Sequence, residues 1–221
     1  IFSKVKLRKI KLIIGIGGGS TLDIAKGLAT KLNTKKNIRY FQGANKINFS
    51  LPTIITIPSI FGSGAEITPS AVFINKEKEL KGGINSDYLR PSMTFLDPNF
   101  VRSNNYKQHV ICSFDALVHA FESFNSKLSN KLTKNLSLLA IINIFKGFKS
   151  LRKKNNLAFK YFAEGSLYAV MSLMHSEQNI TGASSYQLAV HYRYNHAYCG
   201  ASYLVDSIKL EERKIKGSFK T

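Results

Sequence analysis

The hydrophobic and polar positions of the first hundred residues alternate between short apolar runs and turns. Residues 12–16 (LIIGI) lead into three glycines, and residues 53–57 (TIITI) end at Pro58. Short isoleucine-rich runs are typical of strands buried in a parallel sheet. Between them, residues 21–32 place apolar side chains at helical spacing. The order of strand, glycine turn and helix predicts half of a β-α-β unit.

Two further short runs, 72–75 and 94–96, are predicted strands, and the pattern changes at about residue 106. Glycine and proline become rare there, and long segments show helical periodicity. The predicted helices cover roughly 107–126, 130–153, 157–178 and 181–194. We therefore expect an α/β domain over residues 1–104, followed by an all-helical domain over residues 105–221.

Composition is that of a globular protein, with 44% hydrophobic and 20% charged residues. The apolar runs are shorter than the ~20 residues of a membrane span, so we expect a soluble, cytoplasmic protein. Because the chain begins with Ile1, we expect an internal fragment of a longer protein. The net charge of +19 indicates either an anionic partner or a lysine-rich composition. Basic and aromatic residues do not interleave, which makes nucleic-acid binding the less favoured alternative.

Glycine-rich turns follow both predicted strands. Gly17, Gly18, Gly19 and Ser20 precede the helix, and residues 61–66 (FGSGAE) follow the second strand. Such a turn at a helix N-terminus lets backbone N–H groups approach a phosphate. In a parallel sheet both turns would lie at the carboxyl edge, where ligands bind. The first turn is not a GxGxxG motif, and alone it fits a tight turn as well as a phosphate site.

Asp115 and His119 stand four residues apart in a predicted helix, so their side chains share one face. A carboxylate with an imidazole suits Fe(II) or zinc. Taken alone, such a pair is more often a surface hydrogen bond than a metal site. Glu122 lies on the same face and could support a ligand.

Three motifs in order resemble the iron-containing, or group III, metal-dependent alcohol dehydrogenases, which have a dehydroquinate synthase-like fold. The motifs are GIGGGSTLDIAK (15–26), IPSIFGSGAE (57–66) and SFDALVHAFES (113–123). The resemblance covers about residues 10–206. Residues 80–98 (LKGGINSDYLRPSMTFLDP) are most similar to the branch of 3-deoxy-D-manno-octulosonate 8-oxidase, which oxidises the terminal hydroxyl of an acidic eight-carbon sugar.

The resemblance implies an NAD(P)-linked alcohol oxidoreductase in which a hydride passes from a metal-bound alcohol to the nicotinamide. It implies a Rossmann-like dinucleotide-binding domain, truncated at its start, over residues 1–104, and a helical metal-binding domain over residues 105–221. The implied cofactor-binding residues are Gly17, Gly18, Gly19, Ser20, Asp23, Ser59, Ser63 and Gly64. The implied catalytic residues, which are also the ligands of Fe(II) or Zn(II), are Asp115, His119 and His196.

The resemblance implies four metal ligands, of which we expect one to be missing from this chain. An alignment of residues 182–200 without gaps places Gly182 where the first of two later histidines is expected. It also places Ala197 where a glycine normally follows the last histidine. Three protein ligands and a water are sufficient for a catalytic zinc. The sequence therefore leaves open an active enzyme for a small alcohol or sugar acid, or a degenerate relative without catalysis. A homodimer is also left open.

Overall fold

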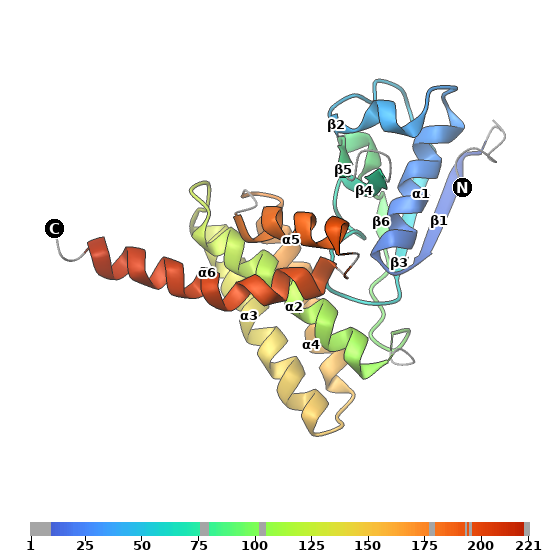
Figure 1. The fold of residues 1–221 in the computed structure, drawn as a ribbon. Helices are drawn as coiled ribbons and strands as arrows, with labels where there is room; N and C mark the ends of the chain where they lie inside the picture. Colours follow the sequence, from blue (N-terminus) through green and yellow to red (C-terminus); the bar gives the residue numbers. More distant parts are fainter. Residues whose placement is uncertain are drawn as a thin grey trace. The chain divides into compact units, whose positions relative to one another are not determined.

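The computed structural model describes residues 10–75, 80–101, 105–176, 180–192, 194 and 196–218. The chain divides into two compact units, Ile1–Asn104 and Asn105–Thr221, and each is described by itself (Figure 1). The first unit contains all the strands of the described residues, and the second contains only helices. The predicted fold class, an α/β region followed by an all-helical region, is confirmed.

A small parallel sheet forms the centre of the first unit. Strands β1 (Leu12–Gly17), β3 (Thr53–Pro58) and β6 (Met93–Thr94) lie in the order β1-β3-β6. Helix α1 (Gly19–Leu32) follows β1 directly and packs on β1 and β3 (Figure 1). Its buried apolar residues recur at helical spacing and are Leu22, Ala25, Ala29 and Leu32. The predicted strand, glycine turn and helix are therefore confirmed, as is their parallel partner strand.

A second sheet, in the order β2-β5-β4, completes this unit. Strands β4 (Ser70–Asn75) and β5 (Leu80–Asn85) are antiparallel, and β2 (Gly43–Ala44) pairs with β5 in parallel. The sequence predicted residues 72–75 of β4 as a strand, but it predicted neither β2 nor β5. Two short 3₁₀ helices are η2 (Ile38–Phe41) and η3 (Asp87–Leu89). The apolar cluster here contains Phe41, Ile47, Ala71, Ile84 and Leu89.

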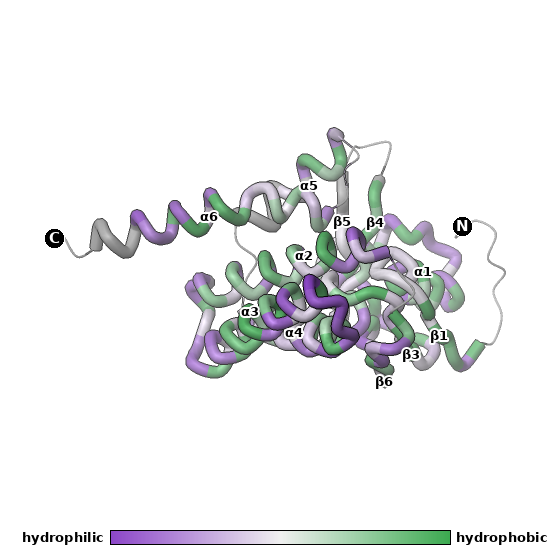
Figure 2. The backbone as a smooth tube through the Cα atoms, turned by 90° about the horizontal axis from the view of Figure 1, so that it is seen from below, coloured by the Kyte–Doolittle hydropathy of each residue, from purple (hydrophilic) through white to green (hydrophobic). Residues whose placement is uncertain are grey.

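Five helices make up the described part of the second unit. They are α2 (Tyr106–Asn125), α3 (Lys131–Arg152), α4 (Leu157–Leu173), α5 (Ile180–His191) and α6 (His196–Ser218). Four were predicted within a few residues, although α4 ends five residues before the expected end at 178. Helix α6 was not predicted, and Figure 2 shows hydrophobic and hydrophilic residues alternating along it. None of the described helices combines the length and hydrophobicity that a membrane span needs.

Helix α2 lies at the centre of this unit, because it contacts each of the other four helices. It begins after Asn105, whose side chain accepts a hydrogen bond from the backbone N–H of Lys107 at 2.9 Å. Asparagine at this position satisfies a backbone donor that the helix itself leaves unpaired. Near its other end, the Ser123 hydroxyl hydrogen-bonds Ser172 of α4, and Ser172 Oγ donates to the carbonyl of Thr133 in α3 at 2.7 Å. These buried bonds fix α2 in register with two neighbours.

Helices α3 and α4 pack closely, because each places a glycine against a large side chain of the other. A Cβ at Gly165 would lie 2.6 Å from Ile144 Cγ1, and a Cβ at Gly147 would overlap the ring of Phe162. Any larger residue at either glycine would separate the helices.

Candidate functional site

The first glycine turn is the junction between β1 and α1. Gly18 is the N-cap of α1, and its carbonyl accepts hydrogen bonds from Thr21 N at 2.9 Å and Leu22 N at 3.1 Å. Gly17 has φ +151°, and a Cβ there would lie 2.7 Å from Thr21 Cβ. Glycine is therefore required at 17 by both backbone conformation and space. Gly19 and Ser20 are the first residues of α1, which begins two residues earlier than the sequence suggested.

The second glycine turn follows β3 and contacts the first. Ser59 N donates to the Gly17 carbonyl at 2.9 Å. A Cβ at Gly19 would lie 2.6 Å from Ser63 Oγ, so the two turns touch there. Gly64 has φ +68°, and its carbonyl accepts from the backbone N–H groups of two later residues of the turn.

The expectation that both turns share the carboxyl edge of one sheet is confirmed, because β1 and β3 are parallel neighbours. Backbone N–H groups at the start of α1 and the adjoining serine hydroxyls form a cradle of the kind that binds phosphate. Asp23 lies in the next turn of α1 and is half-buried. The expected cofactor-binding residues are thus brought together on two neighbouring turns and one helix.

Two buried ionisable residues beside these turns were not recognised as site residues from the sequence. Lys26 of α1 is fully buried, and burial lowers the pKa of its ammonium to about 8, although Asp23 and Glu66 act in the opposite direction. Glu66 is also buried, and burial raises the pKa of its carboxyl from the usual 4.5 to about 7. A lysine on the same face of α1 as Leu22 and Ala29 is a sequence signal that could have revealed the first of these.

Asp115 and His119 form a buried pair of potential metal donors on α2. They are 5% and 7% exposed, and His119 Nε2 lies 4.0 Å from Asp115 Oδ1. Two metal–ligand bonds of about 2.1 Å each can span this separation. His119 Nδ1 is buried and has no hydrogen-bond partner among the described residues. A buried imidazole nitrogen without a partner is unusual away from functional sites. The pair therefore fits a metal better than it fits a structural hydrogen bond.

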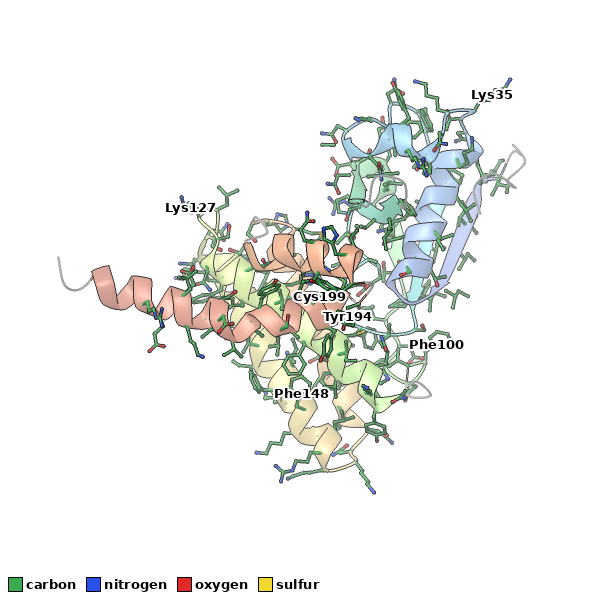
Figure 3. The ribbon with its side chains drawn as sticks, viewed as in Figure 1. Lys35, Phe100, Lys127, Phe148, Tyr194 and Cys199 are labelled. Atoms are coloured by element: carbon green, nitrogen blue, oxygen red, sulfur yellow. The ribbon has the colours of Figure 1, made fainter. Side chains whose placement is uncertain are left out.

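His196 is the first residue of α6, and its ring is held by α5. Its Nδ1 lies 3.1 Å from Ser185 Oγ, and Ser185 is buried. A metal bound through Nε2 would leave this hydrogen bond intact, an arrangement common among metal-binding histidines. Tyr194 precedes α6 and Cys199 lies in its first turn, and both are labelled in Figure 3. Ala197, the residue after His196, is buried at the same helix start.

The described residues do not contain a group of three His, Cys, Asp or Glu side chains placed to hold one metal ion. The structure thus brings Asp115 and His119 together but does not bring His196 into one cluster with them. Helix α6 still packs on α2, since a Cβ at Gly200 would lie 3.4 Å from Val118 Cγ2. The donor types fit Fe(II) or zinc, with one pair formed and a third donor on a neighbouring helix.

Comparisons with known proteins agree for both units. A family model for iron-containing alcohol dehydrogenase matches residues 1–98, and the C-terminal model of the Fe-containing alcohol dehydrogenase family matches residues 109–221. The 4-hydroxybutyrate dehydrogenase of Clostridium kluyveri is 31% identical over 201 residues, which cover 89% of this chain and 54% of that protein.

Solved structures show the same likeness. A 1,3-propanediol oxidoreductase superposes with a TM-score of 0.81 and 26% identity, over 86% of this chain and 50% of that one. An alcohol dehydrogenase from Oenococcus oeni gives the same TM-score, identity and coverage. The chain thus spans about half the length of the curated relatives and solved structures it matches.

Proposed function

Because the chain belongs to the iron-containing alcohol dehydrogenase family, we propose that it acts in an NAD(P)-linked, metal-dependent alcohol oxidoreductase. The observation that carries this proposal is the contact between two glycine turns at the carboxyl ends of β1 and β3. That position is where parallel α/β sheets bind dinucleotides.

In this proposal the pyrophosphate lies at the start of α1, against Gly17, Gly18, Gly19 and Ser20. The N–H groups there carry partial positive charge from the helix dipole. The adjoining residues of the second turn, Ser59, Ser63 and Gly64, lie by the nicotinamide and its ribose, and Asp23 adds a carboxylate beside the turn.

Asp115, His119 and His196 are the proposed metal ligands. A bound Fe(II) or zinc supplies Lewis-acid chemistry, lowering the pKa of an alcohol hydroxyl. Asp115 and His119 are held on one face of α2, and Ser185 orients the imidazole of His196. A nicotinamide held beside the glycine turns would supply the hydride acceptor, so that an alcohol losing a hydride and its hydroxyl proton would become a carbonyl compound.

For the substrate we propose a small alcohol with an acidic group, which suits a chain of net charge +19. Residues 80–98 carry the resemblance to the sugar-acid branch, so the terminal hydroxyl of an acidic eight-carbon sugar is one candidate. 4-Hydroxybutyrate is the other, since the Clostridium kluyveri relative is named for it. Initial rates on these two alcohols, with 1,3-propanediol as the uncharged reference, distinguish the candidates.

The decisive experiment is metal content per chain after anaerobic loading with Fe(II) or zinc and desalting, followed by NADH and NADPH titration. We expect about one ion per chain, lost in His119→Ala, and saturable nucleotide binding. A folded chain that binds nucleotide but retains no metal would instead support the degenerate relative, for which Gly182 is the motivating residue.

The variant Gly182→His tests that alternative directly. If the native site is broken, restoring the histidine raises metal affinity more than about tenfold and creates activity. The matched control is Gln187→His, which adds a histidine at an exposed position of the same helix, α5. Equal effects of both variants would show that position 182 has no special role.

The oligomeric state and location belong to the same proposal. We propose a homodimer in the cytoplasm, and sedimentation of the purified chain over a range of concentrations tests the first part. A single species with the mass of one chain, 24.7 kDa, would contradict it.

A further inference from the structure

Lys26 joins helix α1 to the far end of the second glycine turn. Its Nζ donates to the carbonyl of Ala65 at 2.6 Å, of Thr68 at 2.7 Å and of Ser70 at 2.9 Å. These carbonyls lie about forty residues further along the chain, at the end of the turn and the start of β4. No other described lysine has 0% exposure.

The chemistry of this site requires an ammonium group. Three carbonyl acceptors need three N–H donors, and a protonated lysine has three, whereas a neutral amine has two. A buried cation is costly unless its donors are all satisfied, and here each donor has a backbone acceptor. Because the acceptors are backbone groups, the ammonium fixes the path of the chain from Ala65 to Ser70.

The N-terminus of the same helix adjoins the first turn. Gly19, two helical turns before Lys26, is where Ser63 of the second turn makes its close approach, at 2.6 Å from a Cβ position. The second turn is therefore held against α1 at two points, near its beginning by this contact and at its end by Lys26.

We propose that Lys26 is a positioning residue that holds the second glycine turn in place beside the first, so that both face one dinucleotide. This role rests on the proposed function above for the identity of the ligand. Lys26 has no contact with the nucleotide itself in this proposal. It acts through Ala65, Thr68 and Ser70, which hold Ser63 and Gly64 in place.

The chain contains a matched control. Lys31, on the same helix, also donates to three backbone carbonyls, those of Thr34, Lys35 and Lys36, at 3.0–3.2 Å. Those bonds lie at the end of α1 remote from both turns, and Lys31 is only half-buried. Substituting either lysine removes one ammonium and its bonds to three backbone carbonyls, but only Lys26 reaches the second turn.

The test compares Lys26→Met and Lys31→Met with the unaltered full chain by backbone hydrogen exchange and by fluorescence titration with NADH and NADPH. In Lys26→Met we expect exchange over residues 61–70 to accelerate by more than about tenfold. We expect the nucleotide Kd to rise by more than about tenfold as well. Lys31→Met should change exchange only near its own carbonyls and leave Kd within about twofold. If Lys26→Met fails to fold, Lys26→Gln, whose amide keeps two donors, replaces it.

Unchanged exchange over residues 61–70 would overturn the proposal. Faster exchange with an unchanged Kd would overturn it too, since Lys26 would then stabilise the turn without positioning it for the ligand. If the unaltered chain binds neither nucleotide, the proposed function is wrong. The exchange data then still decide whether Lys26 holds the turn.

Discussion

The two candidate sites of this chain differ in what they are made of. The glycine turns offer mainly backbone groups, and neighbouring backbone holds them: Ser59 N bonds to the Gly17 carbonyl, and Lys26 bonds to three more carbonyls. The proposed metal site would depend on side chains from separate helices, with Asp115 and His119 on α2 and His196 on α6. A backbone site is preserved wherever the fold is preserved, whereas a side-chain site is lost by one substitution. If position 182 is a ligand position, as the resemblance implies, its glycine would be such a substitution.

The largest effect is expected from removing the imidazole of His119. In His119→Ala, metal affinity should fall more than about a hundredfold, because Asp115 would be the one remaining donor of the pair. Nucleotide affinity should not change, since the glycine turns do not involve this residue. The measurement is metal content after desalting, with His175→Ala, an exposed histidine after α4, as the control. Equal metal loss in both variants would contradict the assignment.

The next effect concerns Glu66 and the stability of the α/β unit. In the folded protein the pKa of the Glu66 carboxyl is about 7, whereas its usual value is 4.5. Between pH 4.5 and 7 the folded state therefore binds more protons than the unfolded state. Protonated Glu66 contributes its full stabilisation below pH 4.5, and this contribution is lost as pH rises through about 7. The free energy of unfolding should therefore fall by up to about 3 kcal/mol. The free energy of unfolding of Glu66→Gln, measured by denaturant titration at several pH values, should not show this decrease.

Glu164→Gln is the control for that prediction, because Glu164 lies on α4 in an exposed ion pair with Lys160. Its unfolding should show the same pH dependence as the unaltered chain. Lys26, whose pKa is lowered to about 8, stays largely protonated in the window concerned. If the decrease in unfolding free energy with pH persists in Glu66→Gln, another titratable group causes it.

Substitutions at Gly17 and Gly18 distinguish effects on folding stability from effects on nucleotide binding within one turn. Gly17→Ala places a Cβ against Thr21 in a left-handed conformation, and should cost about 2 kcal/mol of unfolding free energy. Gly18→Ala meets only Ile60, at 3.4 Å, so stability should change by less than about 0.5 kcal/mol. Both should weaken NADH binding, because a methyl group enters the cradle. Binding unaffected by Gly18→Ala would place the phosphate elsewhere.

The smallest effect is expected at Ser185, which touches the metal site through His196. Ser185→Ala removes the hydroxyl 3.1 Å from His196 Nδ1 and should weaken metal binding about tenfold. Cobalt(II) absorption reports both affinity and ligand geometry. Ser185→Thr keeps the hydroxyl and should retain most of the affinity. An unchanged cobalt spectrum in Ser185→Ala would mean that His196 is not a ligand.

The sequence was most informative where periodicity and glycine position act locally. Strands β1 and β3, their turns and helices α2 to α5 follow from patterns within a few residues. The pairing of Asp115 with His119 follows from helical spacing alone, and the structure shows it at 4.0 Å. The roles assigned to these residues remain predictions.

Strand β5 could not be predicted from the sequence, because it depends on contacts with residues distant in the chain and not on a local strand pattern. Gly82 and Gly83 lower the local strand signal, yet a Cβ at Gly82 would lie 2.9 Å from Gln42 Nε2. Glycine is needed there for a neighbour forty residues away. Lys26 differs in part: its position on the apolar face of α1 indicates burial, but only the folded chain supplies its three carbonyl partners. Helix α6 was not predicted, because charged and apolar residues alternate along it and no residue marks a clear helix end.

The glycines that let α3 and α4 approach each other have a kinetic consequence. The two helices are joined by a short connection, residues 153–156, so their pairing requires little loop-closure entropy. We expect the folding of the helical unit to nucleate at this hairpin, and a chevron plot of Gly165→Ala to show slowed refolding with little change in unfolding rate. Helix α2 would then dock on a hairpin already formed. The residues proposed to bind metal would thus join late, which leaves them free to vary without disturbing the nucleus.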